Sequence, residues 1–353
     1  MKKIKDGKMR EKKDLVVTLA DRNYVQQAKQ LFSSVYWNAG WKGDYMLLAH
    51  DIPEKELKWF RDKGIIVKKC KPLSDNPIGV IEIRPPVVTS KFYLFAPEFK
   101  KWNNILFLEG DIIVKASLDR LTKLNRFYGT DVFDRPKLRN QLAVNNKELY
   151  NQIKNRYNLN CRTFNSGVMI FNSDIIKEDS FDKLKSLFNE YKELSNFGEE
   201  GIINLFLYKK WKKLPIAYNL WNYSISHSCR INIKDVNGIV LHFISSKFFQ
   251  NTKPWETDDV FYNEWTENLE KAESIDLSKI QPALEWSGFR IYVYELYLNL
   301  RYILFSMMIN MAGFFIRKIN KIKEYVKRFM GKTGIFLRDN HPALYHKLKR
   351  KNE

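Results

Sequence analysis

The stretch LVVTLADRNYVQQAKQLFSSVYWNAGWKGDYMLLAHDIPEKELKWFRDKGIIV, residues 15–67, decides the fold class of this chain. Three short apolar runs in it are typical of buried strands, at 15–20, 45–49 and 65–67. A helix is expected over 24–37, and a second helix starts at Pro53, a position that proline tolerates, and ends at Gly64. This βαβαβ order predicts an α/β fold, a parallel, doubly wound sheet with a nucleotide crevice at the strand ends.

The composition supports one large globular domain with an appendage. The chain has 353 residues, 44% hydrophobic and 28% charged, with 24 Phe, 18 Tyr and 9 Trp to bury. These values exclude disordered, fibrous and disulfide-scaffold proteins. The three cysteines (Cys70, Cys161 and Cys229) are odd in number and lack C-x-x-C spacing, so we expect reduced thiols.

The charge is strongly basic and unevenly distributed. Lys and Arg number 60 against 40 Asp and Glu, a net charge of +20, which favours a polyanionic partner. Residues 286–353 carry 14 Lys and Arg against 4 acidic residues, and residues 1–13 form a basic N-terminal tail without the apolar region of a signal peptide. Because no zinc spacing, RNP aromatic pattern or helix-turn-helix is present, we expect no nucleic-acid partner.

The C-terminal part differs from the rest in composition. Residues 271–285 are expected to be a connector, and 286–353 a helical, basic extension. Polar residues there fall on one helical stripe: Glu295, Asn299, Ser306, Asn310, Arg317 and Lys321. The uncharged segment 302–316 would span only ~22 Å, short of the ~30 Å of a hydrocarbon core. We therefore expect an amphipathic helix at an anionic membrane surface, with packing on the main domain as the alternative. The protein would then be cytoplasmic and peripheral at the inner face of the membrane.

A second informative stretch is ILFLEGDIIV, residues 105–114. An apolar strand ends there in Glu109-Gly110-Asp111 before a second apolar run begins. Two carboxylates at a strand end can share one divalent cation that also binds diphosphate oxygens. Alone, the pattern is weak evidence for a metal site and is more often a turn with solvated acids.

Five blocks, in order, make the pattern more specific. They are TLADRNY (18–24), SKFYLFAPEFKKWNNILFLEGDIIV (90–114), FNSGVMIFN (164–172), EEGIINLFLYKKWKKLPIAYN (199–219) and LHF…KPW (241–255). With them the chain resembles glycosyltransferase family 8, retaining enzymes that include glycogenins and bacterial lipooligosaccharide galactosyltransferases. The resemblance implies a Rossmann-like GT-A domain over 14–270, a UDP-sugar donor, a Mn²⁺ or Mg²⁺ cofactor, and hexosyl transfer with retention. The basic, aromatic C-terminal extension favours a glycan or lipid-linked acceptor at the membrane, as in lipopolysaccharide or glycan biosynthesis.

The resemblance also assigns donor-binding and metal-binding residues. The nucleotide-sugar would contact Leu19, Asp21, Asn23, Tyr24, Lys91, Glu109, Gly110, Asn165, Ser166 and Lys247. The metal would be held by Glu109, Asp111 and His242, since two carboxylates and an imidazole suit Mn²⁺. Glu109 departs from the family's aspartate. Its extra methylene reaches the same cation or shifts the contact towards the ribose.

The resemblance further implies that three residues act in catalysis. Lys253 of KPW, or else Lys247, would neutralise the departing diphosphate. Glu199 would hold sugar hydroxyls, and Glu200 stands where the family has a glutamine facing the anomeric carbon. We favour a front-side, leaving-group-assisted mechanism with Glu200 as electrostatic support. Covalent attack by Glu200, or a structural role at a helix N-terminus, remains the alternative.

Two departures from the family, Glu109 and Glu200, leave a second functional class open. On that hypothesis the chain is a catalytically inactive protein that binds a nucleotide-sugar or a glycan on the same fold. It would bind the donor without hydrolysis or transfer at any metal concentration.

Overall fold

The structure is a computed structural model that describes residues 12–132, 136–244 and 253–340. The chain divides into two compact units. The first unit comprises Met1–His227 and Ile231–Leu296, and the second comprises Ser228–Arg230 and Tyr297–Glu353. The first unit contains every residue predicted to bind the donor or the metal, although Lys247 lies outside the described residues.

A seven-stranded sheet in the order β3-β2-β1-β4-β7-β6-β8 forms the centre of the first unit. Its strands are β1 (Leu15–Ala20), β2 (Asp44–Ala49), β3 (Ile66–Lys69), β4 (Asn104–Leu108), β6 (Phe127–Asp131), β7 (Phe164–Asn172) and β8 (Trp211–Lys213). A second sheet, ordered β5-β10-β9, consists of β5 (Ile112–Val114), β10 (Val240–His242) and β9 (Leu220–Trp221).

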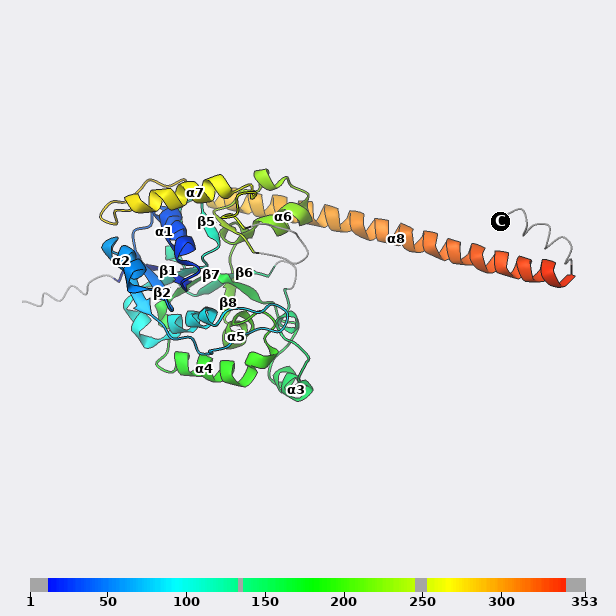
Figure 1. Ribbon diagram of the computed structural model, residues 1–353, viewed down its shortest axis with the longest axis horizontal. Helices are drawn as coiled ribbons and strands as arrows, with labels where there is room; N and C mark the ends of the chain where they lie inside the picture. Colours follow the sequence, from blue (N-terminus) through cyan, green and yellow to red (C-terminus); the bar gives the residue numbers. More distant parts are fainter. Residues whose placement is uncertain (1–11, 133–135, 245–252, 341–353) are drawn as a thin grey trace, which may run out of the picture. The chain divides into compact units, whose positions relative to one another are not determined.

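Helices cover both faces of the large sheet. The helices are α1 (Val25–Ala39), α2 (Glu54–Asp62), α3 (Lys147–Arg156), α4 (Ser180–Tyr191), α5 (Glu200–Phe206), α6 (Asn222–Cys229), α7 (Tyr262–Lys271) and α8 (Gly288–Asn340). Figure 1 shows α1 and α7 on one face of the sheet and α4 and α5 on the other. The α/β, GT-A-type architecture is therefore as predicted.

The parallel half of the sheet follows the predicted βαβαβ order. Strands β1 to β4 pair in parallel, and successive side chains enter two different cores. Val16 and Leu106 pack in the core on the α1 side, whereas Val17 and Phe107 pack with α4 and α5. Because both faces are covered, these strands are apolar without alternation, which is why they are visible in the sequence.

The other half of the sheet is mixed and not wholly parallel, contrary to the expected parallel sheet, although β6 and β8 pair in parallel. Strand β7 pairs antiparallel with β4, with Leu108 opposite Val168, and β6 pairs antiparallel with β7. The chain enters β7 from the edge at which β4 ends. As a consequence the first residues of β7, which include Asn165 and Ser166, lie beside the end of β4.

The small sheet brings a third segment to the same edge. Strand β10 pairs antiparallel with β5, which places His242 opposite Ile112, one residue after Asp111. It also pairs in parallel with β9, with Trp221 opposite His242. The ends of β4 and β10 and the start of β7 therefore meet where the predicted site lies.

The C-terminal region contains one continuous helix, α8, from Gly288 to Asn340. Within the second unit, Arg301 donates from Nε to the carbonyl oxygen of Cys229 at 2.9 Å, where α6 ends. In the described part of the chain, no helix is both long and apolar enough to cross a membrane. In the first unit, the predicted connector contacts α1, since Tyr36 donates from its hydroxyl to the carbonyl of Asp276 at 3.0 Å.

Candidate active site

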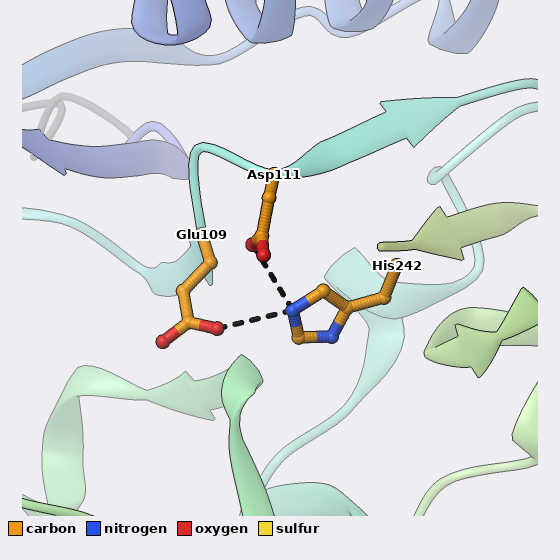
Figure 2. A group of neighbouring side chains, drawn as sticks. All are labelled: Glu109, Asp111 and His242. Carbon is orange, nitrogen blue, oxygen red and sulfur yellow. Dashed lines mark hydrogen bonds and ion pairs between the residues drawn. The ribbon is translucent and has the colours of Figure 1, made fainter. Parts of the chain in front are cut away.

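A histidine and two carboxylates converge at the edge where β4 ends. Glu109 and Asp111 lie on either side of Gly110 in the turn between β4 and β5, and His242 is the last residue of β10. Figure 2 shows the imidazole pointing between the two acids. His242 Nε2 lies 3.1 Å from Glu109 Oε2 and 3.2 Å from Asp111 Oδ1. Ligand atoms of the three residues lie within 4.8 Å of one another, close enough to hold one metal ion.

Each of the two carboxylates forms an ion pair with a lysine. Lys91 Nζ lies 2.5 Å from Glu109 Oε1, and Lys253 Nζ lies 2.8 Å from Asp111 Oδ2. Burial alone would raise the pKa of each carboxyl group, but the neighbouring lysines and His242 hold both pKa values well below the usual range. Each acid is therefore ionised, with one oxygen on a lysine and the other directed towards His242.

The backbone of β7 forms the floor of this site at Gly167. A Cβ atom there would lie 2.5 Å from Glu109 Oε2 and closer still to His242 Cε1, so only glycine fits. Two hard carboxylate oxygens and one imidazole nitrogen are a donor set that suits a divalent cation such as Mn²⁺ or Mg²⁺. The three side chains and the close approach of the backbone fit the metal that the sequence predicts.

A buried ion cluster connects the metal ligands to α5. The ammonium of Lys91 is fully buried and pairs with both Glu109 and Glu199. Ser166 contributes a hydroxyl that donates to Glu199 Oε1 at 3.0 Å. Burial opposes the charge on Lys91, but the two carboxylates raise its pKa. Lys91 thus stays cationic beside the place predicted for the donor phosphates and sugar.

Glu200, the first residue of α5, points at the start of β7. Its Oε2 accepts a hydrogen bond from Asn165 Nδ2 at 2.8 Å and another from the backbone N–H of Ser166 at 3.0 Å. The side chain is buried, and burial raises its pKa to about 7. Asn204 holds α5 against β7, because its amide bonds both the N–H and the carbonyl of Phe164.

The predicted nucleotide-sugar contacts Asp21, Asn23 and Tyr24 form a separate group at the end of β1. Asp21 accepts from the backbone N–H of Asn23 at 2.9 Å, which fixes the turn into α1. Tyr24 is partly exposed and meets the ring of Trp255 edge-on, with centroids 6.0 Å apart. A Cβ on Gly110 would lie 3.5 Å from the Tyr24 ring, so this aromatic pair adjoins the metal ligands. Leu19, in β1, is partly buried in the core.

Three further residues at this site are absent from the sequence prediction. Asn219 bonds both His242 and Asn165 and is the last residue of the fourth sequence block, so its place in that block was a usable signal. Trp255 belongs to the KPW motif, in which the sequence prediction gives a role to Lys253 alone. Arg84 lies outside all five sequence blocks, so the sequence offers no signal for it. Its guanidinium pairs with Glu82 at 2.9 Å, and although burial alone would lower its pKa, the charges of Glu82 and of the site carboxylate Glu109 raise it.

Comparisons with known proteins identify the family of this chain. The family model described as Glycosyl transferase family 8 matches residues 15–259. Glycosyltransferase GlyB of Streptococcus pneumoniae serotype 4 (strain ATCC BAA-334 / TIGR4) is 30% identical over 36% of this chain and 27% of its own length. Galactinol synthase 4 of Arabidopsis thaliana is 23% identical over 58% of this chain and 62% of its own length. This chain thus spans less than two thirds of either relative.

A solved structure shows the same fold. The galactosyltransferase LgtC, in complex with donor and acceptor sugar analogues, superimposes with a TM-score of 0.54. The match covers 73% of this chain and 95% of LgtC at 18% identity. Together with the family model, which spans most of the first unit, this assigns both fold and family. The chain belongs to glycosyl transferase family 8.

Proposed function

We propose that this protein transfers a hexosyl group from a UDP-sugar to a glycan or lipid-linked acceptor, with retention and with Mn²⁺ or Mg²⁺ as cofactor. The observation that carries the proposal is the convergence of Glu109, Asp111 and His242 with two lysines on the carboxylates. A cation held there supplies positive charge to the diphosphate of the donor. The base would lie against Tyr24 and Trp255, whose rings adjoin Gly110.

The reaction needs negative charge to be stabilised at one end of the donor and positive charge at the other. The bond between the anomeric carbon and the β-phosphate oxygen breaks, and the acceptor oxygen bonds the same face of that carbon. The acceptor proton passes to the departing phosphate oxygen. Lys253 stabilises the charge on the diphosphate, and the ionised carboxylate of Glu200 stabilises the oxocarbenium-like carbon. Both interactions strengthen in the transition state.

The donor to examine first is UDP-galactose. The names of two relatives, galactinol synthase and the galactosyltransferase LgtC, favour a galactosyl donor. Lys91, Ser166 and Glu199 offer an ammonium, a hydroxyl and a carboxylate to bind sugar hydroxyls. UDP-glucose and the N-acetylhexosamine donors are the comparison set.

The test is donor turnover by the full chain with Mn²⁺, with Mg²⁺ or with chelator. We expect metal-dependent release of UDP from one donor, lost in Asp111→Asn and kept in the control Asp174→Asn, which alters an exposed acid outside the site. Donor binding without turnover, in the presence of a panel of glycan and lipid-linked acceptors, would support the alternative of a catalytically inactive binding protein. Absence of metal-dependent donor binding would contradict both.

We further propose that the protein acts at the inner face of the membrane, with α8 lying on anionic lipid. Large apolar side chains of α8 in the second unit are exposed: Leu300, Ile303, Leu304, Met307, Met308 and Met311. Residues 286–353 also carry 14 Lys and Arg against 4 acidic residues. Apolar surface beside concentrated positive charge is the combination that binds an anionic interface.

This membrane proposal is tested by sedimentation with phosphatidylcholine vesicles, with and without phosphatidylglycerol. The double variant Leu304→Glu/Met308→Glu alters side chains that are 59% and 68% exposed, so it should fold and lose vesicle binding. The matched control Val144→Glu/Ile280→Glu alters equally exposed residues, 58% and 60%, in the first unit and should bind as the parent does. Equal binding by both variants would refute a role for α8.

A further inference from the structure

Four buried side chains form one hydrogen-bonded chain across the site. Glu200 Oε2 accepts from Asn165 Nδ2 at 2.8 Å, and Asn165 Oδ1 accepts from Asn219 Nδ2 at 2.9 Å. Asn219 Oδ1 in turn lies 2.8 Å from His242 Nδ1. The chain joins the carboxylate at the predicted sugar position to a predicted metal ligand. Asn219, in its middle, belongs to neither group.

One backbone donor fixes the direction of each hydrogen bond in this series of four side chains. The N–H of Gly167 donates to Asn165 Oδ1 at 3.1 Å, and a backbone N–H can only donate. The amide nitrogen of Asn165 must therefore face Glu200, and the amide nitrogen of Asn219 must face Asn165 Oδ1. Asn219 Oδ1 is then left for the imidazole, so His242 donates from Nδ1, and Nε2 is the nitrogen that faces Glu109 and Asp111, where its lone pair would bind a metal ion.

We propose that Asn219 is a positioning residue that fixes the tautomer and orientation of His242 for the metal and links the metal to the sugar-binding side. The inference rests on the proposed metal-dependent function. A metal-binding histidine commonly donates a hydrogen bond from the N–H of its second ring nitrogen to a neighbouring acceptor. This contact fixes the tautomer and raises the basicity of the nitrogen that binds the metal. The side-chain amide of Asn219 can accept this hydrogen bond at its oxygen and donate another to Asn165 from its nitrogen.

Water cannot take over the hydrogen bonds of Asn219, because this side chain and its partners are buried. Asn219 and His242 are each 1% exposed, and Asn165 is 8% exposed. Without the acceptor, the neutral imidazole no longer prefers the tautomer that binds metal, and its Nδ1–H becomes an unpaired buried donor. Loss of such a supporting contact typically costs about 10–100-fold in metal affinity.

Two substitutions separate the two halves of the proposal. Asn219→Leu removes both hydrogen bonds at similar volume, whereas Asn219→Asp keeps an acceptor for His242 and removes the donor to Asn165. The matched control is Asn222→Leu, at another buried asparagine, whose amide has no hydrogen-bond partner among the described residues. Folding of each variant is checked by circular dichroism.

The readouts are the Mn²⁺ dissociation constant, from the paramagnetic resonance of free Mn²⁺, and the ¹⁴N coupling of bound Mn²⁺ in spin-echo spectra. We expect Asn219→Leu to weaken Mn²⁺ binding about 10–100-fold and to reduce the ¹⁴N coupling. Asn219→Asp should keep the Mn²⁺ affinity and the ¹⁴N coupling of the parent while raising KM for the UDP-sugar. Asn222→Leu should change none of them.

Wild-type affinity and ¹⁴N coupling in Asn219→Leu would overturn the proposal. If Asn219→Leu fails to fold, Asn219→Asp decides, because loss of Mn²⁺ binding in this variant would also overturn it. Mn²⁺ binding is read without any sugar transfer, so the outcome is separate from the proposed activity. A parent protein that binds Mn²⁺ but transfers no sugar would refute the proposed activity. The role of Asn219 would still be tested by Mn²⁺ binding to the two Asn219 variants.

Discussion

Replacing Glu200 by glutamine should stabilise this protein at alkaline pH and leave it nearly unchanged at acidic pH. Glutamine is isosteric, and its oxygen can accept the same two hydrogen bonds from Asn165 and Ser166. In the folded chain, burial raises the pKa of Glu200 from 4.5 to about 7. Because the folded-state pKa lies above the unfolded one, protons favour the folded state. The stabilisation is complete below about pH 4.5 and is lost as pH rises through 7.

The magnitude follows from the size of the shift. A difference of about 2.5 pKa units corresponds to about 3 kcal/mol of unfolding free energy that the ionised side chain costs above pH 7.5. At pH 5 most of this cost is absent, so the advantage of Glu200→Gln should grow by about 2.5 kcal/mol between pH 5 and pH 8. All other titrating groups are common to both proteins and cancel in the difference.

The assay is denaturant unfolding of the parent and Glu200→Gln at both pH values with chelator present, followed by near-ultraviolet circular dichroism. The control Glu270→Gln, at an exposed acid on α7, should give the same difference at pH 5 and pH 8, since this side chain meets water in both states. A stability difference of Glu200→Gln that does not change with pH would refute ionisation of a buried Glu200. With donor and metal present, transfer by the parent should rise through pH 7, and the variant should lack this rise.

Further predictions concern the metal ligands and the leaving group. Gly167→Ala should weaken Mn²⁺ binding at least about tenfold by calorimetry, because the added carbon overlaps Glu109 and His242, whereas Gly238→Ala, with its nearest atom at 3.2 Å, should not. Glu109→Asp should weaken Mn²⁺ binding although it restores the family residue, since the shorter side chain withdraws from Lys91; tighter binding would contradict this reasoning. Lys253→Met should lower kcat about 100-fold or more in steady-state transfer assays and leave folding intact, while an unchanged kcat would exclude Lys253 from leaving-group stabilisation.

The sequence by itself determined the parallel half of the fold and the residue types of the site. Strands that are buried on both faces must be apolar throughout, so β1, β2 and β4 are visible as continuous runs. The close spacing of Glu109 and Asp111 at the end of such a run is compatible with a cation site, because a strand end holds both carboxylates at one edge, but a turn with solvated acids has the same pattern. The resemblance then added His242, Lys91 and Lys253, which the structure brings to the same edge.

Only the tertiary structure decided how these groups face one another. A parallel β7 would have placed Asn165 and Ser166 at the opposite edge from Glu109, and nothing in the strand pattern of residues 164–172 distinguishes the two directions. Asp111 and His242 are 131 positions apart, and Asn219 reaches His242 only because β9 and β10 are neighbours. Hydrogen bonds depend on distance and direction in space, whereas sequence periodicity reports only which side chains are buried. The Gly167 N–H fixes the amide orientations of Asn165 and Asn219, and it can do so only in the folded protein.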